Sequence, residues 1–336
     1  MAARELIEDA QTQVIIGAAS SSTTIAVAEN ISIVKKIPLI SYLSSSPKIT
    51  TLAVDEGKDF LFRTVPSDAL QGVVLANFAY EKGYRNLSVL YIDNVYGKGL
   101  LDVFKDNFNA LGGTISAEVS HPETASKDFD TNKDLYLAAL QKAKTAGAEG
   151  LVVMSISDQS NGYIPLAIEN KLFNNFLFVD GSKSEKLIQI VGATALEGMC
   201  GTAPGVDKNT TSWKKFEKGY IAEYGGNISQ KPFMSNTYDA VISAGLAAYA
   251  AQAATGKAPT AITIRDYLRH INDPKGQEVV AGIEGLRQGM KTLNSGLTIN
   301  YQGASGTVDF DEHGDVIAPI EIWCYEGGEI KSKELR

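Results

Sequence analysis

The chain has 336 residues, of which 44% are hydrophobic and 21% are charged, and its formal net charge is -8. These proportions are typical of a globular protein, and the length suggests two domains of about 150 residues each. The acidic balance argues against nucleic acid or an anionic membrane as the main partner, because both require a basic surface.

Strand and helix patterns alternate along most of the chain. The first part predicts a helix over 2–10, a strand over 13–19, a helix over 24–35 and strands over 38–43 and 60–65. The second part predicts helices over 71–82, 97–111, 133–146 and 165–171, between strands over 87–93, 114–120, 150–154 and 176–179. The last part predicts helices over 212–224, 235–254 and 263–271, then strands over 307–310 and 320–325 joined by a turn at 311–314. This alternation indicates an α/β fold with doubly wound parallel sheets.

No segment has the pattern of a membrane span or of a signal peptide. The longest apolar candidate, 240–254, is interrupted by Ser243 and Gln252 and is typical of a buried helix. Charged residues such as Arg4 and Glu5 occupy the place of an apolar signal segment. We therefore expect either a cytoplasmic protein or a chain numbered without its natural beginning.

Two apolar strands run directly into serine clusters. Residues 14–19 lead into 20–24, and residues 38–43 lead into 44–46. Serines after the carboxyl end of a strand place hydroxyls, free N–H groups and a helix dipole around an incoming anion. One such turn alone is better explained as an ordinary N-cap. Its repetition, followed at once by Phe62–Asp68, favours a site for a small carboxylate or phosphate.

Seven segments carry a family resemblance when taken in order. They are Val14–Thr24, Ile40–Thr50, Phe62–Gln71, Val89–Gly99, Glu197–Met199, Tyr238–Ala240 and Tyr301–Asp315. This series, over nearly the whole chain, resembles the periplasmic leucine/isoleucine/valine-binding proteins, the solute receptors of ABC importers. The resemblance implies a type I periplasmic binding fold, with two doubly wound parallel-sheet lobes joined by a three-segment hinge. We expect lobe 1 to comprise 1–64 and 205–321, and lobe 2 to comprise 65–204 and 322–336.

The same resemblance implies an amino-acid ligand in a cleft between the lobes. Ser21 and Ser45 would bind its carboxylate, the Leu43 carbonyl and the Asp180 carboxylate would meet its ammonium, and Phe233 would lie near its side chain. The full expected set is Ser21, Leu43, Ser44, Ser45, Tyr96, Ser157, Asp180 and Phe233. Both charges of a buried zwitterion need partners, which this set would supply.

Two of these positions depend on the family pattern. Asp180, taken alone, is better explained as a solvated turn residue, and Tyr96 could equally belong to the core or the rim. Ser157 stands near a position where the family often has an aromatic residue, which suggests a more polar side-chain pocket.

The resemblance implies a periplasmic or extracellular binding protein, lipid-anchored or soluble, whose partners are a small-molecule ligand and ABC permease subunits. We expect no cofactor, metal or catalytic residue, because His121, His270 and His313 lie in no nucleophile or metal motif. The alternatives are the ligand-sensing ectodomain of a receptor with the same fold and, further off, an amide hydrolase.

Family members normally have a strand, a helix and a strand before the helix matched here by 2–9, and we expect the 14–18 strand to be an exposed apolar edge without them. Cys200 and Cys324 are the only cysteines. They could form a disulfide in an oxidising compartment or be two small buried apolar residues.

Overall fold

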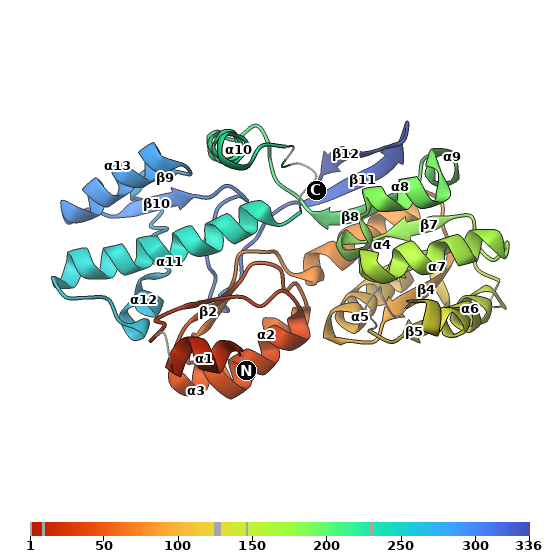
Figure 1. Ribbon diagram of the computed structural model, residues 1–336, viewed down its shortest axis with the longest axis horizontal. Helices are drawn as coiled ribbons and strands as arrows, with labels where there is room; N and C mark the ends of the chain where they lie inside the picture. Colours follow the sequence, from red (N-terminus) through yellow and green to blue (C-terminus); the bar gives the residue numbers. More distant parts are fainter. Residues whose placement is uncertain (1, 9–10, 124–128, 146, 227, 229–231) are drawn as a thin grey trace. The chain divides into compact units, whose positions relative to one another are not determined.

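The computed structural model describes all residues except 1, 9–10, 124–128, 146, 227 and 229–231, and the chain divides into two compact units (Figure 1). Unit 1 comprises Met1–Ser67 and Val206–Ala318, and unit 2 comprises Asp68–Gly205 and Pro319–Arg336. The chain therefore passes from one unit to the other three times.

Unit 2 is built on a seven-stranded sheet with the order β12-β11-β8-β7-β6-β4-β5. Its strands are β4 (Asn86–Ile92), β5 (Thr114–His121), β6 (Gly150–Met154), β7 (Phe176–Phe178), β8 (Cys200–Pro204), β11 (Ile320–Glu326) and β12 (Glu329–Leu335). The strands from β8 to β5 in this order are parallel, whereas β11 runs antiparallel to both β8 and β12. All five residues of β6 are buried, as expected for a strand covered on both faces.

Helices cover both faces of this sheet. One apolar cluster contains α4 (Asp68–Glu81) and α5 (Val95–Ala110), and the other contains α6 (Phe129–Thr145), α7 (Ser157–Glu169) and α8 (Glu185–Val191). A short helix, α9 (Ala193–Leu196), follows α8. The helix predicted over 165–171 in fact begins at Ser157, so the polar run 157–160 forms its first turn, where such side chains are well tolerated.

Unit 1 contains two parallel sheets. The first has the order β1-β2-β3, with β1 (Ile15–Ile16), β2 (Leu39–Ser41) and β3 (Leu61–Arg63). The second pairs β9 (Gln277–Val280) with β10 (Ile299–Gln302). Among the described residues β1 pairs only with β2, which makes it an edge strand of that sheet.

The helices of unit 1 include one continuous helical segment, α2 (Ser21–Val27), a π-helical turn over 28–32 and α3 (Ile33–Lys35). The others are α1 (Ala2–Glu8), α10 (Thr211–Tyr224), α11 (Met234–Thr255), α12 (Ala261–Tyr267) and α13 (Ile283–Asn294). The long helix α11 runs beside β9 and β10 (Figure 1), and residues of all three share one apolar cluster. The predicted ends at 9–10 and 146 lie outside the described residues.

Of the two strands predicted near the C-terminus, 320–325 is present as β11, whereas 307–310 forms no strand. Within 307–310 the structure has only an isolated bridge, between Thr307 and Gln302, and β11 pairs with β8 and β12 instead. The turn at 311–315 is held by Asp311, whose Oδ1 accepts hydrogen bonds from the N–H groups of His313 and Asp315. This turn belongs to unit 1, whereas β11 belongs to unit 2.

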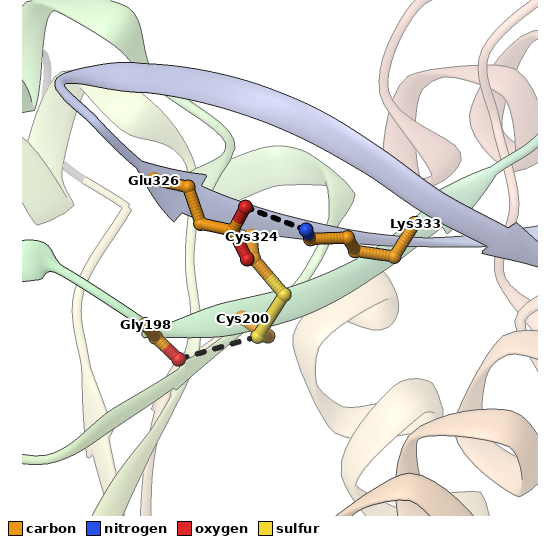
Figure 2. Close-up of a disulfide and its surroundings, with 5 residues drawn as sticks. All are labelled: Gly198, Cys200, Cys324, Glu326 and Lys333. Atoms are coloured by element: carbon orange, nitrogen blue, oxygen red, sulfur yellow. Dashed lines mark hydrogen bonds and ion pairs between the residues drawn. A yellow bond between two sulfur atoms is a disulfide. The ribbon is translucent and has the colours of Figure 1, made fainter.

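A disulfide joins Cys200 at the start of β8 to Cys324 on β11 (Figure 2). The two residues lie directly opposite each other in the antiparallel pairing of these strands. Both are buried. Of the two explanations for the cysteines, the structure therefore has the bonded pair.

Among the helices of the described residues, none combines the length and the hydropathy that crossing a membrane requires.

Candidate functional site

The first serine turn forms the start of α2. Ser20 is the N-cap residue, and its Oγ accepts a hydrogen bond of 3.3 Å from the N–H of Thr23. Ser21 is the first residue of the helix and is almost fully buried. Its Oγ accepts a hydrogen bond of 3.2 Å from the N–H of Ser46, so the two serine turns are in direct contact.

The second serine turn differs from the sequence expectation. It leads into a three-residue 3-10 helix over 47–49, capped by Ser46, and not into an α-helix. The Ser44 hydroxyl lies 2.8 Å from Thr24 Oγ1 and donates to the carbonyl of Ala18 at 3.1 Å. That hydroxyl thus joins the two turns, and only α2 can contribute a helix dipole here.

A buried arginine, which the sequence analysis did not single out, holds the second turn in place. Arg63 is fully buried and donates two 2.6 Å hydrogen bonds to the Asp315 carboxylate. Its Nη1 donates to the carbonyl oxygens of Ser44 (3.3 Å) and Ser46 (3.0 Å). In a planar trans peptide the N–H points opposite to the C=O. The N–H of Ser45 therefore points away from the guanidinium.

In unit 2 the carboxylate of Asp180 lies just after the end of β7. Its Oδ1 accepts hydrogen bonds from the Tyr96 hydroxyl (2.7 Å) and from Nε2 of Gln71 (2.9 Å). Gln71 also donates to the carbonyl of Thr202 at 3.3 Å, which fixes its orientation. Burial raises the pKa of Asp180 from its ordinary value, against the effect of these hydrogen bonds. A cation placed at this carboxylate would favour its ionised form.

Tyr96 is a hydrogen-bond donor at this position. Burial, and then the negative charge of Asp180, raises its pKa well above the ordinary value, so the hydroxyl keeps its proton. A side chain at Gly181 would approach both the carbonyl of Ser155 (2.6 Å) and the Tyr96 hydroxyl (3.0 Å). The ends of β6 and β7 and the start of α5 therefore converge closely.

A buried histidine, which lies in no sequence motif, is next to this region. His121, at the end of β5, lies with Nε2 3.0 Å from the Ser155 hydroxyl and Nδ1 3.0 Å from the carbonyl of Pro122. A carbonyl only accepts, so Nδ1 carries the proton and Nε2 accepts from Ser155. Burial lowers the pKa of His121 to about 4.

The predicted residues fall into two groups. Unit 1 holds Ser21, Leu43, Ser44, Ser45 and Phe233, and unit 2 holds Tyr96, Ser157 and Asp180. The structure brings the first serine turn onto the second, and Tyr96 onto Asp180. Ser157 is the first residue of α7, and Phe233 is the N-cap residue of α11 with a φ of 62°. No hydrogen bond between described residues links Ser157 to Asp180.

Within the part of the chain that the structure describes, no three His, Cys, Asp or Glu side chains gather in a way that could hold a metal ion.

Comparison with known proteins gives a family and several relatives. The family model described as "Receptor family ligand binding region" matches residues 1–328. The chain is 24% identical over 334 residues to the chemotactic signal transduction system substrate-binding protein BasB of Halobacterium salinarum, covering 98% of this chain and 74% of that protein.

Two solved structures are similar over nearly the whole chain. The leucine binding protein LivK of Thermotoga maritima has a TM-score of 0.77 at 23% identity, covering 99% of this chain and 82% of that chain. The branched-chain amino acid transporter substrate binding protein LivJ of Streptococcus pneumoniae, solved with isoleucine, has a TM-score of 0.73 at 20% identity, covering 100% and 82%.

Proposed function

We propose a transport function for this chain, which belongs to the family described as "Receptor family ligand binding region". In this proposal it is a periplasmic or extracellular solute-binding protein that delivers a small amino acid or amino-acid-like ligand to an ABC importer. The likeness to the two solved structures confirms the predicted type I periplasmic binding fold. The ligand and the importer are the proposed parts.

The observation that carries the proposal is the setting of Asp180. Its carboxylate is partly withdrawn from water, and the hydrogen bonds from Tyr96 and Gln71 fix its orientation. In the hydrogen bonds described, no basic side chain neutralises its charge. A partly desolvated carboxylate is stabilised most by a cation that brings its own hydrogen-bond donors. The ammonium of an amino acid has this chemistry.

Unit 1 would bind the other charge. Ser21 begins α2, and the turn 44–46 is fixed by Arg63 so that the N–H of Ser45 points away from the guanidinium. Hydroxyls, an N–H and the positive end of α2 are groups that stabilise a carboxylate. Ser44 contributes by holding the two turns together, since its hydroxyl is engaged with Thr24 and Ala18.

The proposal predicts the effect of replacing Asp180 by asparagine. The affinity for an amino-acid ligand should fall by about 2–5 kcal/mol, because the ammonium would lose its counter-charge. The affinity for a ligand of the same shape without the amine should change by less than about 0.5 kcal/mol. Isothermal titration of both ligands against both proteins measures the difference, with the exposed Asp158→Asn on α7 as the matched control.

If Asp180→Asn lowers the affinity for the two ligands equally, Asp180 does not bind the ammonium. Equal losses in Asp158→Asn and Asp180→Asn would attribute the effect to the overall charge of unit 2.

A sensory role is the second candidate, and the similarity to BasB favours it. The name of that relative places it in a chemotactic signal transduction system. The ligand chemistry would be the same in both roles, and the partner would differ. Ligand-dependent binding of the chain to permease subunits would support the transport role. Ligand-dependent binding to the ectodomain of a signalling receptor, without binding to permease subunits, would support the sensory role.

A further inference from the structure

Unit 2 contains a cavity of about 510 Å³ that is separate from the Asp180 region. It lies at the starting ends of β7 and β8, lined by Phe176 and Cys200, whereas Asp180 follows the other end of β7. Cavities that bind small molecules commonly measure about 300–1,000 Å³ and combine an apolar lining with a few polar groups. This cavity has such a size, and its lining is mixed, with the polar residues Asn174, Asn175 and Thr194 beside the apolar ones.

Part of the lining is aromatic and apolar. Phe78 and Phe176 are buried, Tyr84 and Met199 are partly buried, and all four line the cavity. Burial, and then the negative charge of Glu149, raises the pKa of Tyr84, so its hydroxyl remains a hydrogen-bond donor. A planar aromatic group would gain ring contacts here beyond simple burial.

The rim carries one charge of each sign. Lys82 lies with its Nζ 5.4 Å from the centre of the Phe78 ring, and Glu197 accepts a 2.9 Å hydrogen bond from the N–H of Gly327. Neither takes part in any of the ion pairs found between described residues. A ligand with a single charge would meet one opposite and one like charge at this rim.

We propose that this cavity is a second binding site, for a small zwitterion with an aromatic side chain. The carboxylate of the ligand pairs with Lys82, its ammonium pairs with Glu197, and its ring lies on Phe78, Tyr84 and Phe176. Both charges are on exposed side chains, where each pair adds little, so the affinity is in about the millimolar range.

The test observes the cavity directly through Met199. The chain has five methionines, so labelling with ¹³C-methyl methionine gives a simple spectrum in which Met199 reports on the cavity and the fully buried Met154 reports on the fold. Met199→Leu assigns the resonance. Phenylalanine, 3-phenylpropanoate and phenethylamine are titrated in turn; they share the phenyl ring, and the second lacks the amino group of the first and the third lacks its carboxylate.

Phenylalanine should shift the Met199 resonance to saturation, and each single-charge analogue should bind at least about threefold more weakly. Lys82→Gln and Glu197→Gln should each lower the affinity for phenylalanine by about two- to fivefold. The exposed Lys186→Gln on α8 should leave that affinity unchanged. Asp180→Asn should leave the response intact, which separates this site from the proposed transport function.

A Met199 resonance that does not saturate with phenylalanine would overturn the site. Equal binding of all three probes, or unchanged binding in both Lys82→Gln and Glu197→Gln, would overturn the zwitterion assignment.

Discussion

At the scale of single residues, Arg63 supports the candidate anion site without being placed to touch a ligand. Replacing it by methionine would leave Asp315, which is 8% exposed, without its main partner. Removing one member of a buried ion pair commonly costs about 3–5 kcal/mol. We expect Arg63→Met to lower the free energy of unfolding of unit 1 by this amount, measured by urea denaturation.

The matched control is Arg269→Met. Arg269 also pairs with an aspartate, Asp59, but the two side chains are 32% and 35% exposed, and such pairs are worth less than about 1 kcal/mol. If Arg63→Met costs no more than Arg269→Met, the anchoring role of Arg63 is wrong.

His121 makes stability depend on pH in the acid range. Its pKa falls from 6.5 to about 4 on folding, so the unfolded chain takes up the proton first as the pH drops. The contribution of neutral His121 is therefore fully present above about pH 6.5 and is lost progressively down to about pH 4. The total amounts to about 3 kcal/mol of unfolding free energy.

Denaturation of the wild type and of His121→Gln at pH 7 and pH 4 measures this contribution. Burial raises the pKa values of Asp180 and Asp239, which act in the opposite direction, so the difference between the two proteins isolates the histidine. Equal pH dependence in both proteins would mean that His121 is not buried in its neutral form.

At the scale of elements, the disulfide closes a long loop between β8 and β11. Cys200 and Cys324 are 124 positions apart in the sequence, and the loop contains the whole second segment of unit 1. Loops of this length give stabilisations of about 2–5 kcal/mol when they are closed. We expect Cys200→Ala with Cys324→Ala to lower the unfolding free energy by this amount in urea denaturation.

The neighbouring surface pair gives the control. Lys333 on β12 donates to Glu326 on β11 at 2.5 Å (Figure 2), with side chains 38% and 35% exposed. Lys333→Met should cost less than about 1 kcal/mol. A double alanine variant as stable as Lys333→Met would show that the disulfide adds nothing.

The sequence predicted elements best where the pattern is long and apolar. The strand over 150–154 agrees with β6, and the helix over 235–254 agrees with α11 to one residue at each end. The start of α7 was missed because 157–160 is polar and Pro165 looked like a helix start. The strand β12 was missed because its residues are mostly exposed and charged, so no buried face marks it.

The sequence predicted residues of the candidate site better than it predicted the side chains that hold those residues in place. Asp180 and Tyr96 were expected separately, and the structure joins them. Gln71 and Arg63 lie in the segment Phe62–Gln71, which carried the family resemblance, yet nothing local shows that their side chains reach Asp180 and the turn 44–46. Such contacts depend on tertiary packing, which a single sequence does not display.

At the scale of the whole molecule, buried polar contacts join distant segments of one unit. Asp239 on α11 accepts hydrogen bonds from the Tyr301 hydroxyl (2.7 Å) and from the N–H groups of Ala304 (2.9 Å) and Ser305 (2.7 Å). A side chain at Gly303 would come within 2.5 Å of this carboxylate, so a glycine is required there. The resemblance placed both segments in the family series, and the structure gives the physical reason for their pairing.

The central claim is that both charges of one small amino acid are recognised. A thermal-shift panel of amino acids first selects the one that raises the melting temperature most, since a true ligand stabilises by mass action. Titration calorimetry then compares that amino acid with the same molecule lacking its amine and with the same molecule lacking its carboxylate. The account predicts that the amino acid binds at least about thirtyfold more tightly than either analogue, the equivalent of about 2 kcal/mol per lost charge. Binding of the acid without its amine as tight as that of the amino acid, or a panel in which no amino acid shifts the melting temperature, would contradict it.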